Sequence, residues 1–342
     1  MQLNVQLKPI NQQVVTIMGA SSGIGRLTAF KFAQKGAKVM VSARSETGLK
    51  SLVEEIQTFG GEAEYLVADV SELEQVRAVV EKTVARYGRI DTWVNAAATG
   101  VLAPFEKITQ EEFKRVIDVT LMGQVNGVMA ALPCLKQEGG GAIICVSSME
   151  GRRSLPLQSP YSTAKHGLEG FLEALRVELQ HDRLPISVTS ILPAVINTPF
   201  YNNARTKLGV KPMGIPPYYS PHIVADAILY AAEHPTRDLI SGDVGRVLDL
   251  LQRISPELVD SLLLLTGFTL QRTNEPKSEH APNNLFNPVA EHDKIEGDFG
   301  ELVIPTFLDW LDMNPQIKWG AVAALGVAAL FRWQGMGYRR RE

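Results

Sequence analysis

The glycine-rich run at positions 19–25 constrains the fold of this chain more than any other feature. It reads Gly19-Ala20-Ser21-Ser22-Gly23-Ile24-Gly25. The apolar residues 13–18 before it predict a strand, and residues 24–35 predict a helix. Glycines at a strand-to-helix turn let the backbone approach a pyrophosphate, to which the helix N-terminus presents free N–H groups. We therefore expect a dinucleotide to contact Gly19, Ser21, Ser22, Gly23, Ile24 and Gly25. A tight turn without a ligand is the alternative.

Apolar strand-like runs alternate with helical segments along most of the chain. This alternation is typical of a parallel sheet that is covered by helices on both faces. The sequence therefore predicts an α/β fold with three layers and a doubly wound parallel sheet. The predicted strands are 13–18, 38–43, 63–68, 92–96, 142–146 and 186–192, with a last one inside 238–247. The predicted helices are 24–35, 46–59, 73–87, 110–135, 161–181, 223–234 and 256–268.

The length of 342 residues favours one large α/β domain with an appendage over two equal domains. We expect a catalytic domain at 1–272. Residues 273–300 are polar, contain several prolines and asparagines, and indicate a linker or a segment that lies over the surface. Residues 301–342 form a C-terminal tail with a short apolar helix.

A tyrosine and a lysine four residues apart, Tyr161 and Lys165, form the second informative pattern. At this spacing both side chains lie on one face of a helix. A nearby ammonium lowers the pKa of a phenol, and a phenol that exchanges protons near neutrality suits alcohol–carbonyl chemistry. Ser148 stands thirteen positions before Tyr161. The pair alone is a weak signal, but it is specific when combined with the glycine turn.

Taken together, these motifs resemble the short-chain dehydrogenase/reductase family, in its simple single-domain branch, from about Val14 to Gly245. The resemblance implies a Rossmann-type sheet and assigns catalysis to Ser148, Tyr161 and Lys165. It also implies cofactor contacts by Asp69, Val70, Asn95, Tyr161, Lys165, Pro193, Ile196 and Thr198. Relatives in this family often form dimers or tetramers, so we expect a homo-oligomer.

Three positions depart from the family pattern. Met18 replaces a threonine that ties the glycine turn, and Ala194 replaces a glycine after Pro193. Thr120 stands where the family commonly has an asparagine that bends its helix and holds a water bridging to the lysine. We keep Thr120 as a fourth catalytic candidate, because its hydroxyl is able to hold a water over a shorter reach.

Arg44 follows the second predicted strand, where an acidic residue would accept a hydrogen bond from the 2′-hydroxyl of NAD. A guanidinium at this place favours the 2′-phosphate of NADP. We therefore predict NADP as the cofactor. The alternative is that Arg44 is a solvated surface residue and that NAD binds.

Charge and residue spacing exclude several other functions. A net charge of −3 gives no basis for nucleic-acid binding. The six histidines are scattered, and no spacing suggests a metal site. Cys134 and Cys145 are expected to be buried thiols, and the N-terminus lacks the layout of a secretory signal, so we expect a cytoplasmic protein.

The C-terminal tail contains thirteen uninterrupted apolar residues, 319–331, between Lys318 and Arg332. As a helix this run would span roughly 20 Å, which is short of the roughly 30 Å hydrocarbon core of a membrane. Aromatic residues and arginines within 332–341 suit an interfacial anchor. Two interpretations stay open for 319–338: contact with a membrane, or packing on the domain or on a second copy.

The function that these patterns predict is hydride transfer between NADP and a carbonyl or secondary alcohol. Tyr161 would be the general acid–base, Lys165 would lower its pKa and hold the ribose, and Ser148 would orient the substrate oxygen. A long connection at 200–221 with Tyr201, Tyr218 and Tyr219 predicts a lid and a partly apolar small-molecule substrate. The alternative is a catalytically weak NADP-binding or membrane-associated regulatory protein. An epimerase or dehydratase is a third candidate, but this chain lacks its glycine spacing and larger C-terminal domain.

Overall fold

The computed structural model describes residues 5–289, 293–314 and 316–317. Its centre is a parallel sheet of seven strands in the order β3 (Glu62–Val67), β2 (Lys38–Ala43), β1 (Val14–Met18), β4 (Thr92–Asn95), β6 (Gly141–Val146), β7 (Ile186–Pro193) and β10 (Asp238–Ser241). The chain starts at the middle of the sheet, builds one half outward, and then crosses back to build the other half. This is the doubly wound topology that the alternating pattern predicts.

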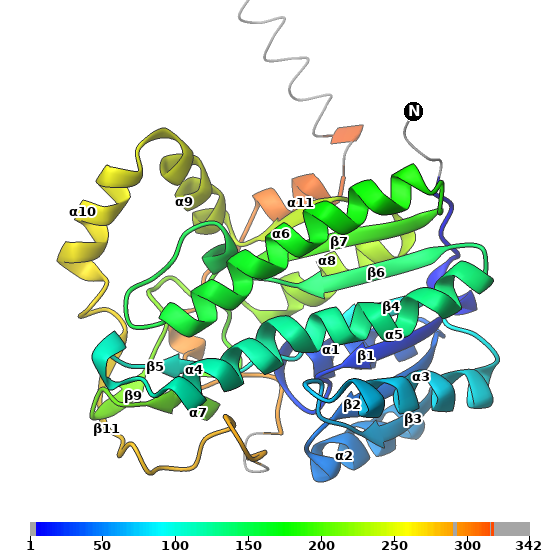
Figure 1. Ribbon diagram of the computed structural model, residues 1–342, viewed down its shortest axis with the longest axis horizontal. Helices are drawn as coiled ribbons and strands as arrows, with labels where there is room; N and C mark the ends of the chain where they lie inside the picture. The colour runs from blue at the N-terminus through cyan, green and yellow to red at the C-terminus, as the bar shows by residue number, and fades with distance from the viewer. Residues whose placement is uncertain (1–4, 290–292, 315, 318–342) are drawn as a thin grey trace, which may run out of the picture.

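Helices cover both faces of the sheet, as Figure 1 shows. One face carries α1 (Gly23–Gln34), α2 (Glu46–Thr58) and α8 (Pro221–Glu233). The other face carries α3 (Leu73–Tyr87), α5 (Gly123–Gln137) and α6 (Ser159–His181). The three-layer fold is therefore confirmed.

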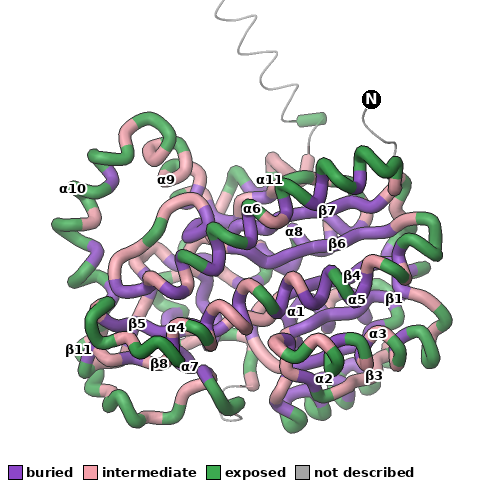
Figure 2. Tube along the Cα trace, viewed as in Figure 1, coloured by how far each residue is buried: buried purple, intermediate pink, exposed green. Residues whose placement is uncertain are grey.

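Alternate residues of each central strand serve the two faces, as the period of a β-strand requires. In β1, Val15 and Ile17 pack against the α1 side, whereas Met18 packs against the α5 side. In β6, Ile144 and Cys145 divide in the same way. The strands are buried on both faces, which explains their almost continuous apolar sequences (Figure 2).

The predicted single helix at 110–135 is interrupted in the structure. It consists of α4 (Gln110–Ile117), a π-helical turn (Asp118–Met122) and α5. Within the described residues, Gln110–Gln137 is the stretch long and apolar enough to cross a membrane, but more than half of it is buried in the protein. This burial accounts for its apolar character.

Small elements surround the carboxyl ends of the strands. The predicted connection at 200–221 contains α7 (Phe200–Asn203), β8 (Arg205–Thr206) and β9 (Val210–Pro212). β8 pairs with β5 (Val101–Leu102), and β9 pairs with β11 (Arg272–Pro276). A hairpin of α9 (Asp243–Ile254) and α10 (Pro256–Thr266) projects beside them (Figure 1). α11 is Leu308–Asp312, and 3-10 turns lie at Ile10–Gln12, Phe105–Lys107, Met149–Gly151 and Gly300–Leu302.

The polar segment predicted as a linker, 273–300, packs on the rest of the protein in its described residues. Besides the β9–β11 pair, Leu285 is fully buried against Val101 and Val116. Arg115 donates a hydrogen bond from Nε to the Leu285 carbonyl at 3.0 Å. The apolar run 319–331 lies outside the described residues.

Candidate active site

The glycine turn after β1 has a geometry that requires glycine at two places. Gly19 has φ of +87°, and a Cβ there would lie 2.5 Å from the Ala97 nitrogen. A Cβ on Gly25 would lie 2.2 Å from the Gly19 carbonyl oxygen. The turn therefore closes tightly and leaves the first turn of α1 facing a cavity.

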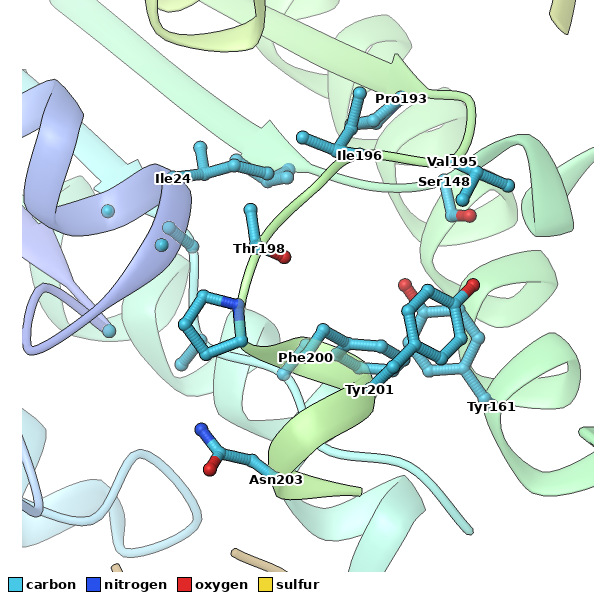
Figure 3. Close-up of a pocket in the computed structure, with 18 of the residues that line it drawn as sticks. Ile24, Ser148, Tyr161, Pro193, Val195, Ile196, Thr198, Phe200, Tyr201 and Asn203 are labelled. Atoms are coloured by element: carbon cyan, nitrogen blue, oxygen red, sulfur yellow. The ribbon is translucent and has the colours of Figure 1, made fainter. Parts of the chain in front are cut away.

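A single cavity of about 390 Å³ joins this turn to the Tyr–Lys pair. Figure 3 shows Ile24 and Thr198 on one side of it, Ser148 and Tyr161 on the other, and Phe200 between them. Most of the predicted site residues line it: Gly19, Ser21, Ser22, Gly23, Ile24, Gly25, Arg44, Val70, Ser148, Tyr161, Lys165, Pro193, Ile196 and Thr198. The structure thus brings together residues from the carboxyl ends of five strands, where ligands of open parallel sheets bind.

Tyr161 and Lys165 lie on the same face of α6, as their spacing predicts. The Lys165 Nζ lies 5.4 Å from the centroid of the Tyr161 ring and donates a hydrogen bond to the Val146 carbonyl at 2.7 Å. Ser148 and Tyr161 both line the cavity, and the Ser148 side chain acts to lower the pKa of the phenol. Ser148 begins the 3-10 turn after β6, and its Oγ accepts a hydrogen bond from the Glu150 nitrogen at 3.0 Å. This turn fixes the serine opposite the phenol.

The pKa of Tyr161 is shifted in the direction opposite to the predicted one. Burial raises the pKa of the Tyr161 phenol, the Glu150 carboxylate raises it further, and the Ser148 side chain lowers it by less. Burial also lowers the pKa of Lys165 to about 8. The correction has a physical cause: both groups are removed from water, which disfavours their charged forms.

Glu150 is a buried carboxyl group in the same cavity, and the sequence analysis did not select it. It lies two residues after Ser148, and its side chain accepts a hydrogen bond from the Ser162 hydroxyl at 2.6 Å. Burial raises the pKa of Glu150 to about 8, although Lys165 and Ser162 act against the shift. Its place between Ser148 and Tyr161 in the sequence was the signal that could have found it.

Thr120 does not line the cavity, and its role as a fourth catalytic residue stays a prediction. Its hydroxyl donates to the Thr99 carbonyl at 3.0 Å and accepts from the Thr99 nitrogen at 3.1 Å. The helix bends at this position by a π-helical turn, although the asparagine is absent. Both bonds go to the Thr99 backbone, so the hydroxyl ties the π-helical turn to the segment after β4.

Asp69 and Asn95 flank the cavity without lining it. Asp69 forms an ion pair with Arg115 at 2.5 Å and accepts a hydrogen bond from the Ser71 nitrogen. These contacts hold the pKa of Asp69 below its usual range, although burial acts in the opposite direction. Asn95 accepts from the Trp93 indole at 2.9 Å and donates to the Gln124 carbonyl. The side chains of Asp69 and Asn95 are therefore bound to protein groups beside the cavity.

The end of the cavity beyond Tyr161 has a mostly apolar lining, to which the charged side chain of Arg153 also belongs. Met149, Phe200, Tyr201, Ile215, Leu248 and Leu263 line it. Phe200 lies against the Tyr161 ring with centroids 5.2 Å apart. Of the three tyrosines predicted for the lid, Tyr201 lines the cavity. Tyr218 and Tyr219 are instead buried in the core, where their hydroxyls accept hydrogen bonds from the Gly214 and Val244 nitrogens.

Residues 273–317, which we call the C-terminal extension, contribute cavity residues that no sequence pattern indicated. They are Asn284, Pro288, Val289 and Asp293. No group of three or more His, Cys, Asp or Glu side chains that could hold a metal ion occurs in the part of the chain that the structure describes.

Comparisons with known proteins agree with this architecture. The family model for short chain dehydrogenases matches residues 13–209. A Bacillus subtilis relative named uncharacterized oxidoreductase YxnA is 38% identical over 293 residues, covering 85% of this chain and 82% of the relative. The 3-oxoacyl-(acyl-carrier-protein) reductase FabG of Thermotoga maritima is 34% identical over 245 residues, covering 69% and 98%. An alcohol dehydrogenase structure from Thermococcus sibiricus, complexed with 5-hydroxy-NADP, aligns with a TM-score of 0.58 at 27% identity, covering 67% and 95%.

The sheet, the glycine turn and the cavity define a nucleotide-binding α/β oxidoreductase. The chain belongs to the short-chain dehydrogenase family, as its motifs predicted. It is an NAD(P)-dependent oxidoreductase that acts on CH–OH or C=O groups.

Proposed function

We propose that the protein transfers a hydride between NADP and a carbonyl or secondary-alcohol carbon of a partly apolar small molecule. The observation that carries the proposal is the single cavity that joins the glycine turn to Ser148, Tyr161 and Lys165. A nicotinamide ring supplies the hydride donor or acceptor when the cofactor is bound. The remaining chemistry is proton transfer, which the side chains of this chain supply.

Tyr161 is the group suited to that proton transfer. Its hydroxyl and that of Ser148 lie at the same side of the cavity, so a substrate oxygen bound there would meet two hydroxyls. The phenol is protonated at neutral pH already at its ordinary pKa, and burial raises that pKa further. Protonated Tyr161 is a proton donor, so the resting enzyme is poised for carbonyl reduction.

Lys165 and the cavity walls have positioning roles. Lys165 is fully buried beside the tyrosine and is fixed by the Val146 carbonyl. We assign it to the cofactor ribose and to the electrostatic environment of Tyr161. The apolar end of the cavity supports a substrate with a hydrophobic part, because burying apolar surface favours binding there.

Arg44 supports NADP as the preferred cofactor. It lines the cavity at the end of β2, where the 2′ position of the adenosine ribose is read in this class of fold. A guanidinium at this place forms charge-assisted hydrogen bonds with a phosphate.

The test is oxidation of NADPH with a panel of apolar ketones by the unsubstituted protein and by Tyr161→Phe. We expect Tyr161→Phe to lower kcat/KM by about 10²–10⁴-fold, the range for loss of a general acid, and to leave NADPH binding unchanged. Tyr87→Phe is the matched control, since Tyr87 lies on α3 and its buried hydroxyl has no hydrogen-bond partner among the described residues. Binding of NADPH without turnover across the panel would instead favour the regulatory alternative.

The homo-oligomer, the cytoplasmic location and the membrane contact of residues 319–338 stay predictions. Light scattering of the full chain measures the oligomer. Flotation with anionic lipid vesicles, comparing the full chain with one that ends at Ile317, tests the membrane contact.

A further inference from the structure

Two described pieces of the C-terminal extension, residues 284–289 and 293–299, lie along the nucleotide side of the cavity. Asn284 and Asp293 line the cavity together with Arg44 and Ser45. They are about 240 residues away from the end of β2 in sequence, as the Arg44–Asn284 separation of 240 shows. The wall of the nucleotide site therefore includes a segment outside the strand–helix repeat.

The Asp293 carboxylate lies against the first turn of α2. Its Oδ2 accepts hydrogen bonds from the Ser45 hydroxyl at 2.7 Å and from the Thr47 hydroxyl at 3.1 Å. A Cβ on Gly48 would lie only 2.5 Å from the Asp293 Cγ, so the absence of a side chain at Gly48 makes room for this carboxylate. The N-terminus of a helix also stabilises a negative charge.

The residues after Asp293 are held against the start of α1 and the segment after β7. The Lys294 carbonyl accepts a hydrogen bond from the Gly23 nitrogen at the start of α1 at 2.9 Å. The Gly297 nitrogen donates to the Asn197 carbonyl at 3.2 Å, and a Cβ on Gly297 would lie 2.4 Å from the Thr198 carbonyl oxygen. These close contacts fix the position of Asp293 between α1 and α2.

Arg44 and Asp293 thus present opposite charges to the same part of the cavity. Arg44 donates from its guanidinium to the carbonyls of Asn284 at 2.5 Å and Phe286 at 2.9 Å. The end of β2 lacks an acidic residue of its own. In this class of fold an acid at this place accepts from the 2′-hydroxyl of NAD, whereas an arginine accommodates a 2′-phosphate.

We propose that Asp293 is a specificity-determining residue for the cofactor: its carboxylate opposes the 2′-phosphate of NADP and accepts from the 2′-hydroxyl of NAD. The inference rests on the proposed binding of a nicotinamide dinucleotide. The Asp293 carboxylate opposes the effect of the Arg44 guanidinium on a bound phosphate. Cofactor preference is therefore set by an acidic residue of the C-terminal extension and a basic residue directly after β2. The 2′-phosphate of NADP, bound at the N-terminus of α2, would either displace the Asp293 carboxylate or be repelled by it.

The test measures dissociation constants of NADPH and NADH by the fluorescence of the bound reduced cofactor, with no substrate present. We expect Asp293→Asn to shift the ratio of the two constants towards NADPH by about tenfold or more. Gly48→Ala should shift the ratio in the same direction, because its Cβ pushes the Asp293 carboxylate away without removing its charge. Arg44→Gln should shift the ratio towards NADH.

Asp298→Asn is the matched control. Asp298 belongs to the same segment, but its carboxylate contacts Lys211, Lys294 and Asn202 rather than α2. Two outcomes would overturn this inference but leave the proposed function intact. One is an unchanged ratio of the NADPH and NADH dissociation constants in both Asp293→Asn and Gly48→Ala, and the other is an equal shift of that ratio in Asp298→Asn. If the unsubstituted protein bound neither dinucleotide, the proposed function would fail, and the inference with it.

Discussion

At the scale of single residues, the site combines groups that the sequence selected with one that it did not. Tyr161 and Lys165 follow from spacing, because helix geometry places residues four apart on one face, whereas Ser148 follows from its offset before Tyr161 and from the family resemblance. The direction of the Tyr161 pKa did not follow from spacing, because burial is a property of the whole fold. Glu150 shows the same limit: two positions after Ser148, it gains its role from being buried beside Tyr161.

Glu150→Gln tests how this buried carboxyl group controls the active-site tyrosine. The ionised carboxylate raises the pKa of Tyr161, so its removal lowers the pH at which the phenolate forms. Alcohol oxidation needs the phenolate as base. We therefore expect the rising limb of kcat/KM for oxidation to move to lower pH in Glu150→Gln. An unchanged pH–rate profile would contradict the assignment.

The same substitution has a predicted effect on stability, with a defined sign. The pKa of Glu150 is raised to about 8 in the folded protein from 4.5, so between these pH values the folded state holds a proton that the unfolded state has lost. This group therefore lowers the free energy of unfolding as pH rises from about 4.5 to 8. The Tm of Glu150→Gln should lack this decline, which thermal unfolding at pH 5, 7 and 9 measures.

At the scale of elements, the sequence predicted the sheet and its helices but not the break between α4 and α5. Buried strands are continuous apolar runs, and helices have a period of 3.6 residues, so both are visible in one dimension. The π-helical turn depends on bonds between Thr120 and the backbone of Thr99, which is 21 residues away. A contact between distant segments leaves no periodic signal.

Thr120→Val tests whether this threonine has a structural rather than a catalytic role. Valine has nearly the same shape but leaves the buried N–H and C=O of Thr99 without their partner. We expect a loss of about 1–3 kcal/mol in the free energy of unfolding, measured by urea denaturation. The pH–rate profile should keep its shape.

Thr120→Ser is the control for this prediction, since it keeps both bonds and loses one methyl group, worth about 0.8 kcal/mol. A stable Thr120→Val variant with an altered pH–rate profile would restore the relay that the family resemblance implied.

At the scale of the whole molecule, the C-terminal extension was the hardest part to predict. Its polar composition indicated a linker because it has few apolar side chains to bury. Much of its attachment uses backbone atoms, such as the carbonyls of Asn284, Phe286 and Lys294. Every residue type has a carbonyl, so bonds of this kind leave no pattern in the sequence. The apolar part of the attachment rests on few side chains, among them Leu285 and Phe299, which stacks on Tyr218.

Leu285→Ala asks whether the extension unfolds with the catalytic domain. Leu285 is fully buried among Val101, Ala103 and Val116. Val101 lies on β5 and Val116 lies on α4. Removing such a side chain leaves a cavity and should lower the free energy of unfolding by about 2–5 kcal/mol. Leu264→Ala on α10 is the control, because Leu264 is 74% exposed and its truncation should change stability by less than about 0.5 kcal/mol. If Leu285→Ala left the urea midpoint unchanged, the extension would unfold separately, and a wall of the nucleotide site would be able to open while the sheet stays folded.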